Sequence, residues 1–132
     1  MAPSLQVAAL GVSSRARLGR GDVEGAVEAG QGAHDALGRL GEIEEGESMV
    51  RLAFAEALDQ SGRRDDARRA LAVAHQRLLE RADRIEEPAW RHRFLHAVPV
   101  NARILALADE WRAIGANAPE ASPPAVAPIA QP

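Results

Sequence analysis

Apolar residues recur along most of this chain at the three- and four-residue spacing that is typical of amphipathic helices. The spacing predicts a first helix over residues 4–18, with Ser4 as its N-cap. Gly19 and Gly21 interrupt the pattern, and Asp22 is placed to cap a second helix. The apolar residues of the first helix that recur at helical spacing are Leu5, Ala8, Ala9, Val12, Ala16 and Leu18.

The second helix is predicted over residues 22–40, and it is weak by itself. It contains four internal glycines, each of which costs about 1 kcal/mol relative to alanine in a helix. The helix must therefore depend on tertiary packing. Its buried face is expected to contain Val23, Ala26, Val27, Ala33, Leu37 and Leu40.

A third helix is predicted over residues 47–60 and a fourth over residues 65–84, with Gly62 between them. The apolar positions of the third are Val50, Ala53, Phe54, Ala57 and Leu58, flanked by Met49 and Leu52. Those of the fourth are Ala67, Ala70, Leu71, Ala74, Leu78, Ala82 and Ile85, which leaves an arginine-rich outer face to solvent. Acidic residues suit the positive N-terminal end of the third helix, and these are Glu44, Glu45 and Glu47.

The C-terminal part of the pattern predicts a short helix from Pro88 through Leu95 and a last helix from Pro99 through Trp111. Trp90 and Trp111 are expected in the core of this terminal pair. Residues 115–132 are rich in alanine and proline and are predicted to form a disordered tail, which leaves residues 1–114 as one helical domain. With 3% aromatic residues and no alternating runs, the predicted fold class is all-α.

Two of the predicted helices repeat the same small residues at an interval of forty-one. The stretches GDVEGAVEAGQGAHDAL (21–37) and GRRDDARRALAVAHQRL (62–78) share one glycine, three alanines, one histidine and one leucine at matching offsets. Small residues let two antiparallel helices approach closely, and the glycine allows the tight turn before the second helix. The repetition therefore predicts a helix hairpin that occurs twice.

These positions resemble the tetratricopeptide repeat. In the second unit the resemblance rests on Ala55, Leu58, Gly62, Ala67, Leu71 and Ala74. In the first unit the matching residues are Ser14, Gly21, Ala26 and Ala33, whereas Arg17 and Gly30 stand where large apolar residues belong. The interval of forty-one exceeds the usual period of about thirty-four, which implies that each helix is longer by about one turn.

A wider resemblance covers residues 10–111. The stretch over residues 44–111, with its RFL and NARILALA motifs, is similar to the closing segment of large bacterial regulators of the myxobacterial type, including serine/threonine kinases and signalling ATPases. The resemblance implies a short α-solenoid of two long helix hairpins and a C-terminal capping helix pair. The chain carries no kinase or nucleotide-binding motif, so we expect no enzymatic activity and no cofactor.

Composition excludes several classes of function. The absence of cysteine leaves no disulfide framework and no thiolate metal site. No apolar run is long enough to cross a membrane and no signal peptide is recognisable, so a cytoplasmic location is expected. A net charge of −3, with acidic and basic residues interspersed, argues against a nucleic-acid partner.

The histidines are the residues most suggestive of chemistry. His92 and His96 are four residues apart, which places both on one helix face at a spacing that a metal accepts, but no third ligand is evident. His34 and His75 occupy matching places in the two repeats and are expected to line a groove or to bond a neighbouring helix. A small helical metal protein or enzyme that uses His92 and His96 is thus one alternative, and an accessory module of a transcription regulator is another.

The sequence favours a protein–protein interaction scaffold that belongs to a bacterial signalling protein. The partner would lie across the first helices of the two hairpins, where an arginine-lined surface suits an acidic segment. The residues expected to contact it are Ser13, Arg17, Arg51 and Glu56. About three repeats are usually needed for stability, and the first helix is apolar and lacks a polar outer face. We therefore also expect a homo-oligomer or adjoining repeats.

Overall fold

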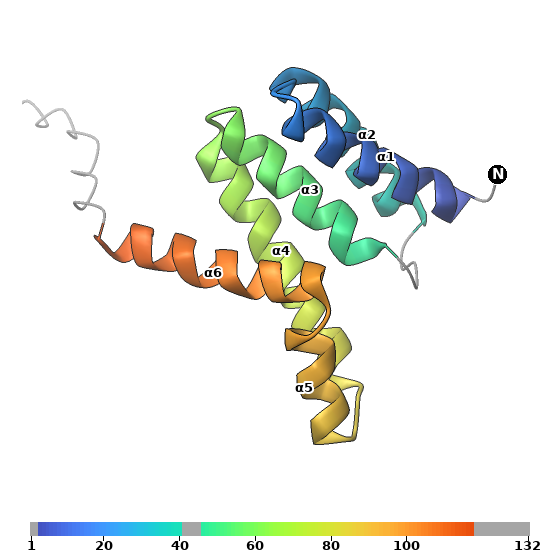
Figure 1. Ribbon diagram of the computed structural model, residues 1–132, viewed down its shortest axis with the longest axis vertical. Coiled ribbons are helices and arrows are strands. Elements are labelled where there is room, and N and C mark those ends of the chain that lie inside the picture. The colour runs from blue at the N-terminus through green and yellow to red at the C-terminus, as the bar shows by residue number, and fades with distance from the viewer. Residues whose placement is uncertain (1–2, 41–45, 118–132) are drawn as a thin grey trace, which may run out of the picture.

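The computed structural model describes residues 3–40 and 46–117, and these form six helices and no strand. The prediction of an all-α fold is confirmed. The first five helices begin and end within one residue of their predicted positions, although Ser4 lies inside the first helix and does not cap it. The helices, labelled as in Figure 1, are α1 (Pro3–Gly19), α2 (Val23–Leu40), α3 (Glu47–Gln60), α4 (Arg64–Asp83), α5 (Pro88–His96) and α6 (Pro99–Asn117).

Two tight turns join α1 to α2 and α3 to α4. Gly21 and Gly62 have φ angles of 83° and 85°, a left-handed conformation that favours glycine. Asp22 caps α2 as predicted, because its Oδ1 accepts a hydrogen bond of 3.0 Å from the backbone N–H of Gly25. Both pairs therefore begin their second helix directly after a glycine turn.

The central helix is α3, which contacts α1, α2, α4 and α6. It is buried on several sides, and not only along the predicted face, because different helices cover opposite sides of it. Its buried residues are Glu47, Val50, Leu52, Ala53, Phe54, Ala55, Ala57 and Leu58.

Small residues lie where the helices approach one another. Ala26 and Ala67 are fully buried, as the repeat predicts. The hydroxyl of Ser14 on α1 donates a hydrogen bond of 2.7 Å to the carbonyl of Ala26 on α2. A Cβ at Gly30 would lie 3.3 Å from the Cα of Phe54, so α2 and α3 can be this close only because Gly30 has no side chain.

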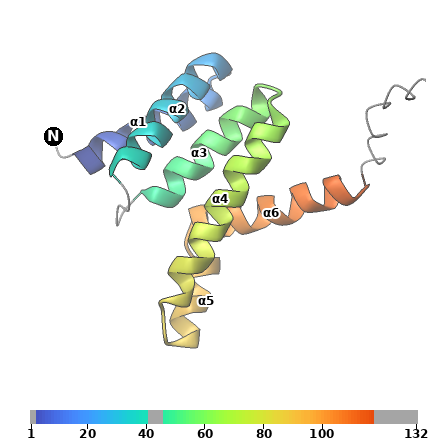
Figure 2. The ribbon, with the colours of Figure 1, turned by 180° about the vertical axis from the view of Figure 1, so that it is seen from behind.

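The first helix pair, α1 and α2, has a surface on which α3 packs. The second pair, α3 and α4, has an equivalent surface, on which α6 packs. On α1 and α2 this surface consists of Gly11, Ser14, Gly30, Ala33 and Leu37. Forty-one residues later the corresponding residues are Leu52, Ala55, Leu71, Ala74 and Leu78, and they form one buried cluster with Ile104 and Leu107 of α6. Figure 2 shows α6 crossing α4 in this position. Thus α6 covers the surface of the second pair that is equivalent to the surface of the first pair covered by α3.

Most of the larger apolar residues of α1 face away from the core. Leu5 and Val12 are each 60% exposed, and Ala9 and Ala16 are also exposed. The side that faces the core carries Val7, Gly11 and Ser14 instead. Close approach accompanies this orientation, because the sulfur of Met49 lies 2.8 Å from the place that a Cβ at Gly11 would occupy, and the small residues of α1 lie against α3.

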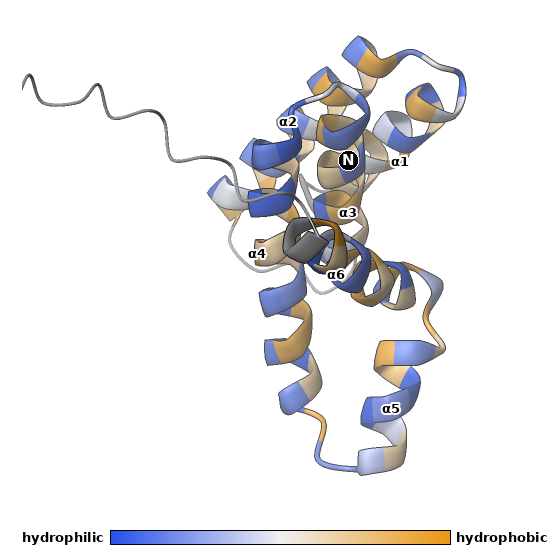
Figure 3. Cartoon of the chain, turned by 90° about the vertical axis from the view of Figure 1, so that its left-hand side faces the viewer, coloured by the Kyte–Doolittle hydropathy of each residue, from blue (hydrophilic) through white to orange (hydrophobic). Residues whose placement is uncertain are grey.

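The face prediction for α4 is confirmed, since its five buried residues are all among those expected. In Figure 3 the hydrophilic residues of α4 lie along the edge that faces away from α5 and α6. By contrast, α2 exposes Leu40, which was expected inside.

Polar contacts add to the apolar packing by which the C-terminal helices dock on α3 and α4. The guanidinium of Arg91 donates to the carbonyls of Ala82 and Ile85, at the end of α4, and the amide of Asn101 donates to the carbonyl of Phe94. No residue of α5 is fully buried, and Trp90, expected in the core, is 65% exposed.

Three sequence expectations fall wholly or partly outside the described residues. These are the charges of Glu44 and Glu45 and the disorder of the tail over residues 115–132. Within the described part, α6 continues through Asn117.

Candidate interaction surfaces

Of the four residues expected to contact a partner, Ser13 and Arg17 lie together near the end of α1. The Nε of Arg17 donates a hydrogen bond of 3.3 Å to the hydroxyl of Ser13, and its Nη1 lies 3.2 Å from the Oδ2 of Asp22. Arg17 thus contributes to the turn between α1 and α2, and its charge is matched locally.

Arg51 and Glu56 lie on different sides of α3. Five residues separate them, which corresponds to about 140° around a helix. Arg51 is largely buried and contacts Glu47, whereas Glu56 forms an ion pair of 3.8 Å with Arg15 on α1. Arg51 thus has a structural role, and Arg51 and Glu56 do not share one side of α3.

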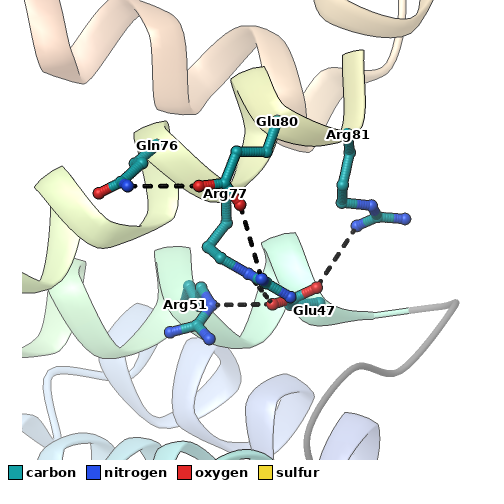
Figure 4. Close-up of polar contacts among 6 residues, drawn as sticks. All are labelled: Glu47, Arg51, Gln76, Arg77, Glu80 and Arg81. Carbon is teal, nitrogen blue, oxygen red and sulfur yellow. Dashed lines mark hydrogen bonds and ion pairs between the residues drawn. The ribbon is translucent and has the colours of Figure 1, made fainter. Parts of the chain in front are cut away.

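Glu47 forms the centre of a cluster of charged residues between α3 and α4 (Figure 4). Its side chain is only 2% exposed, and its Oε1 accepts hydrogen bonds of 3.2 Å from Arg51 and 2.9 Å from Arg77. The Nη1 of Arg81 lies 4.0 Å from its Oε2. Glu47 does begin α3, as predicted, but its main role is to join α3 to α4 through buried charge, and a binding role is not needed to explain it.

His34 lies in a groove of about 330 Å³ between α2, α3 and α4. Its ring centroid is 4.7 Å from that of Phe54. Burial lowers the pKa of His34, and the nearby charge of Arg51 lowers it further, while Asp35 acts in the opposite direction. The charged residues on the rim of the groove pair with one another, and these are Arg63, Asp66 and Arg69.

Two adjoining hollows surround Trp111 on α6. One, of about 260 Å³, lies between α4 and α6 and is lined by Arg68, Leu71, Ala72, His75, Ala108, Trp111 and Arg112. The other, of about 150 Å³, shares Arg68 and Trp111 and is also lined by Asp59, Arg64 and Ile114. Arginines and an indole ring thus come together on a surface where the sequence predicted only a solvated face. The signal in the sequence was the spacing of Arg64, Arg68 and His75, which places them on one side of α4.

The histidine pair on α5 is exposed. The rings of His92 and His96 have centroids 4.4 Å apart. Within residues 3–40 and 46–117 no group of three or more histidine, cysteine, aspartate or glutamate side chains is arranged to hold a metal. The pair therefore offers two ligands and no built site.

Comparison with known proteins does not identify a family: no family model, no curated protein and no solved structure matches this chain. None of the helices in the described part has the length and apolar character needed to span a bilayer.

Proposed function

We propose that this chain is a protein–protein interaction module, built as a short α-solenoid of two tetratricopeptide-like hairpins. In this arrangement α5 and α6 form the closing pair. The proposal is supported by the matching surfaces on the two helix pairs, one covered by α3 and the other by α6. Such arrays serve mainly to present extended surfaces to other proteins. The resemblance to bacterial regulators would give the contact a regulatory role.

The observation that carries the proposal is the pair of hollows around Trp111. The indole is only half buried, and Ile114 beside it is 54% exposed, so an apolar side chain of a partner would find an apolar contact there. Aromatic residues and arginine are enriched where proteins bind one another. The His34 groove has a larger volume, but both arginines on its rim already pair with Asp66.

The charges around Trp111 suit an acidic partner segment. Arg64, Arg68 and Arg112 line the hollows, and Asp59 is the only carboxylate among the lining residues. Arg112 also lies 3.7 Å from Asp109, which is exposed on α6. Arginine binds carboxylates in a fixed, bidentate geometry, which gives orientation as well as attraction. We therefore infer a segment that carries two or more carboxylates beside an apolar side chain.

Selection from a random peptide library against the full chain tests this proposal. We expect enrichment of peptides that combine acidic residues with an apolar one. Arg68→Glu should weaken their binding at least about tenfold, because it replaces attraction with repulsion in both hollows. Binding is measured by fluorescence polarisation of the labelled peptides.

Arg93→Glu provides the matched control, since Arg93 is exposed on α5 and lines neither hollow. It makes the same change of charge and should leave binding within about twofold of the unchanged protein. Peptides that show no acidic preference, or that bind Arg68→Glu as well as the unchanged chain, would contradict the proposal.

A further inference from the structure

The outer side of α1 carries an apolar stripe that no described residue covers. Leu5, Ala9, Val12 and Ala16 follow one another at spacings of four, three and four residues, so they lie in line on one side of the helix. Leu5 and Val12 are each 60% exposed. The opposite side of α1, which includes Val7, faces the core. The helix is therefore apolar on the side away from the core as well.

The equivalent stripe on α3 is a helix-packing surface. Forty-one residues beyond Ala9, Val12 and Ala16 are Val50, Ala53 and Ala57, and all three are fully buried. Val50 packs on α1 and α2 through the cluster that it forms with Val7, Ala33 and Leu37. This side of the repeat is thus the side by which one helix pair packs on another, and on α1 it has no partner within residues 3–40 and 46–117.

We propose that a second copy of this chain covers the α1 stripe, with the two α1 helices antiparallel about a twofold axis. A head-to-tail contact is unfavourable, because the surface that would receive α1 on the second helix pair is already covered by Ile104 and Leu107 of α6. A symmetric contact between two copies of the same stripe uses the face that remains.

When two copies of the stripe lie antiparallel, the larger residues of one copy lie opposite the alanines of the other. Leu5 lies opposite Ala16 of the other copy, and Ala9 lies opposite Val12 of the other copy. Each larger side chain therefore meets an alanine, which allows close packing without overlap. In a parallel arrangement the two leucines would meet each other, as would the alanines, and gaps would remain between them.

Electrostatics also favours the antiparallel arrangement. All the charged residues of α1 are arginines in its second half, Arg15 and Arg17, and Arg20 follows directly after the helix. In an antiparallel pair these arginines are at opposite ends of the interface, whereas a parallel pair would bring them together. The helix dipoles also favour the antiparallel arrangement, because the positive end of each helix then lies near the negative end of the other.

The contact is expected to be weak and reversible. One helix face provides less than the roughly 800 Å² per partner that a standard stable complex buries. Dimerisation should therefore depend on concentration in the micromolar range. Because α1 does not contact α6, the contact is independent of the proposed site around Trp111.

Sedimentation velocity over a range of concentrations tests the proposal. The unchanged chain should shift from monomer to dimer as its concentration rises. Val12→Arg should raise the dissociation constant at least about tenfold, because it places two charges near the symmetry axis. Val73→Arg is the matched control, because Val73 is an exposed valine on α4, and it should leave dimerisation unchanged. A chain that stays monomeric at all concentrations, or a Val12→Arg variant that dimerises normally, would overturn the proposal.

Engineered cysteines test the orientation in a chain that has none of its own. A mixture of Leu5→Cys and Ala16→Cys proteins should form a covalent heterodimer on mild oxidation. Leu5→Cys alone should not, because eleven residues at 1.5 Å each separate the two sites by about 16 Å in the antiparallel arrangement. Efficient crosslinking of Leu5→Cys to itself would indicate a parallel contact and would overturn the proposed orientation.

Discussion

Gly30 occupies a place in the repeat where the second unit has Leu71. On α2 the space for a side chain is taken by α3, since a Cβ there would lie 3.2 Å from the hydroxyl of Ser14 and 3.3 Å from the Cα of Phe54. The backbone of α3 cannot move aside as a flexible side chain can. The glycine that weakens α2 as an isolated helix is therefore what allows α2 and α3 to pack.

Replacing Gly30 with leucine should destabilise the protein by about 2 kcal/mol or more, because the side chain cannot be accommodated against α3. Gly38→Ala is the matched control in the same helix. A Cβ at Gly38 meets nothing within 4 Å, so alanine should stabilise the protein by up to about 1 kcal/mol. Urea unfolding followed by circular dichroism measures both. Equal effects of the two substitutions would show that Gly30 does not lie at a close contact.

His34 should make stability depend on pH. Its pKa in the folded protein is below its ordinary value of 6.5, so the unfolded chain binds a proton more readily than the folded one. The contribution of His34 to the free energy of unfolding is therefore fully present above pH 6.5, and it decreases as the pH falls below 6.5. His34→Gln should reduce the difference in urea midpoint between about pH 5.5 and about pH 7.5. An unchanged difference would mean that His34 is protonated equally in both states.

Residue types alone predicted which side of α4 is buried, but they did not predict which side of α1 is buried. In α4 most apolar residues form one stripe, with Val73 and Leu79 outside it, and the arginines mark the outer side. In α1 apolar residues occur on both sides, and the packing side is determined by Gly11 and Ser14, which are small enough to let α3 approach. A rule that places the larger apolar residues inside chooses the wrong side in such a helix.

At the scale of helices, the contact between α3 and α4 combines apolar packing with the buried charge of Glu47. The cluster could not be read from the sequence, because Glu47 and Arg77 are thirty residues apart and come together only when the two helices pack. The sequence did show that Glu47 begins a helix. It did not show that arginines of the next helix would cover it.

Glu47→Gln should destabilise the protein by about 2 kcal/mol, because it leaves Arg51 and Arg77 facing a neutral group in a buried position. Glu80→Gln is the matched control, since Glu80 also pairs with Arg77 but is 45% exposed. That change should cost less than about 0.5 kcal/mol. Chemical denaturation of both variants gives the comparison, and similar losses would contradict a structural role for the buried carboxylate.

At the scale of the whole molecule, the forty-one-residue repeat predicted two of the helix contacts well and the terminal pair less well. Matching small residues identify where α1 meets α2 and where α3 meets α4, because those contacts depend on sterics that are visible in the sequence. The placement of α5 and α6 depends on apolar packing through Ile104 and Leu107 and on hydrogen bonds to backbone carbonyls from Arg91 and Asn101. No spacing of residue types reveals those hydrogen bonds.

The central claim is that α6 covers on the second helix pair the surface that α3 covers on the first. Hydrogen–deuterium exchange of the backbone amides, resolved by peptide, tests this claim most directly. We expect the amides of α3 to exchange slowest and the segment around Ile104 and Leu107 to be protected together with α4, while α5 exchanges fast. Exchange of that segment as fast as α5 would show that α6 is not docked, and it would contradict the account.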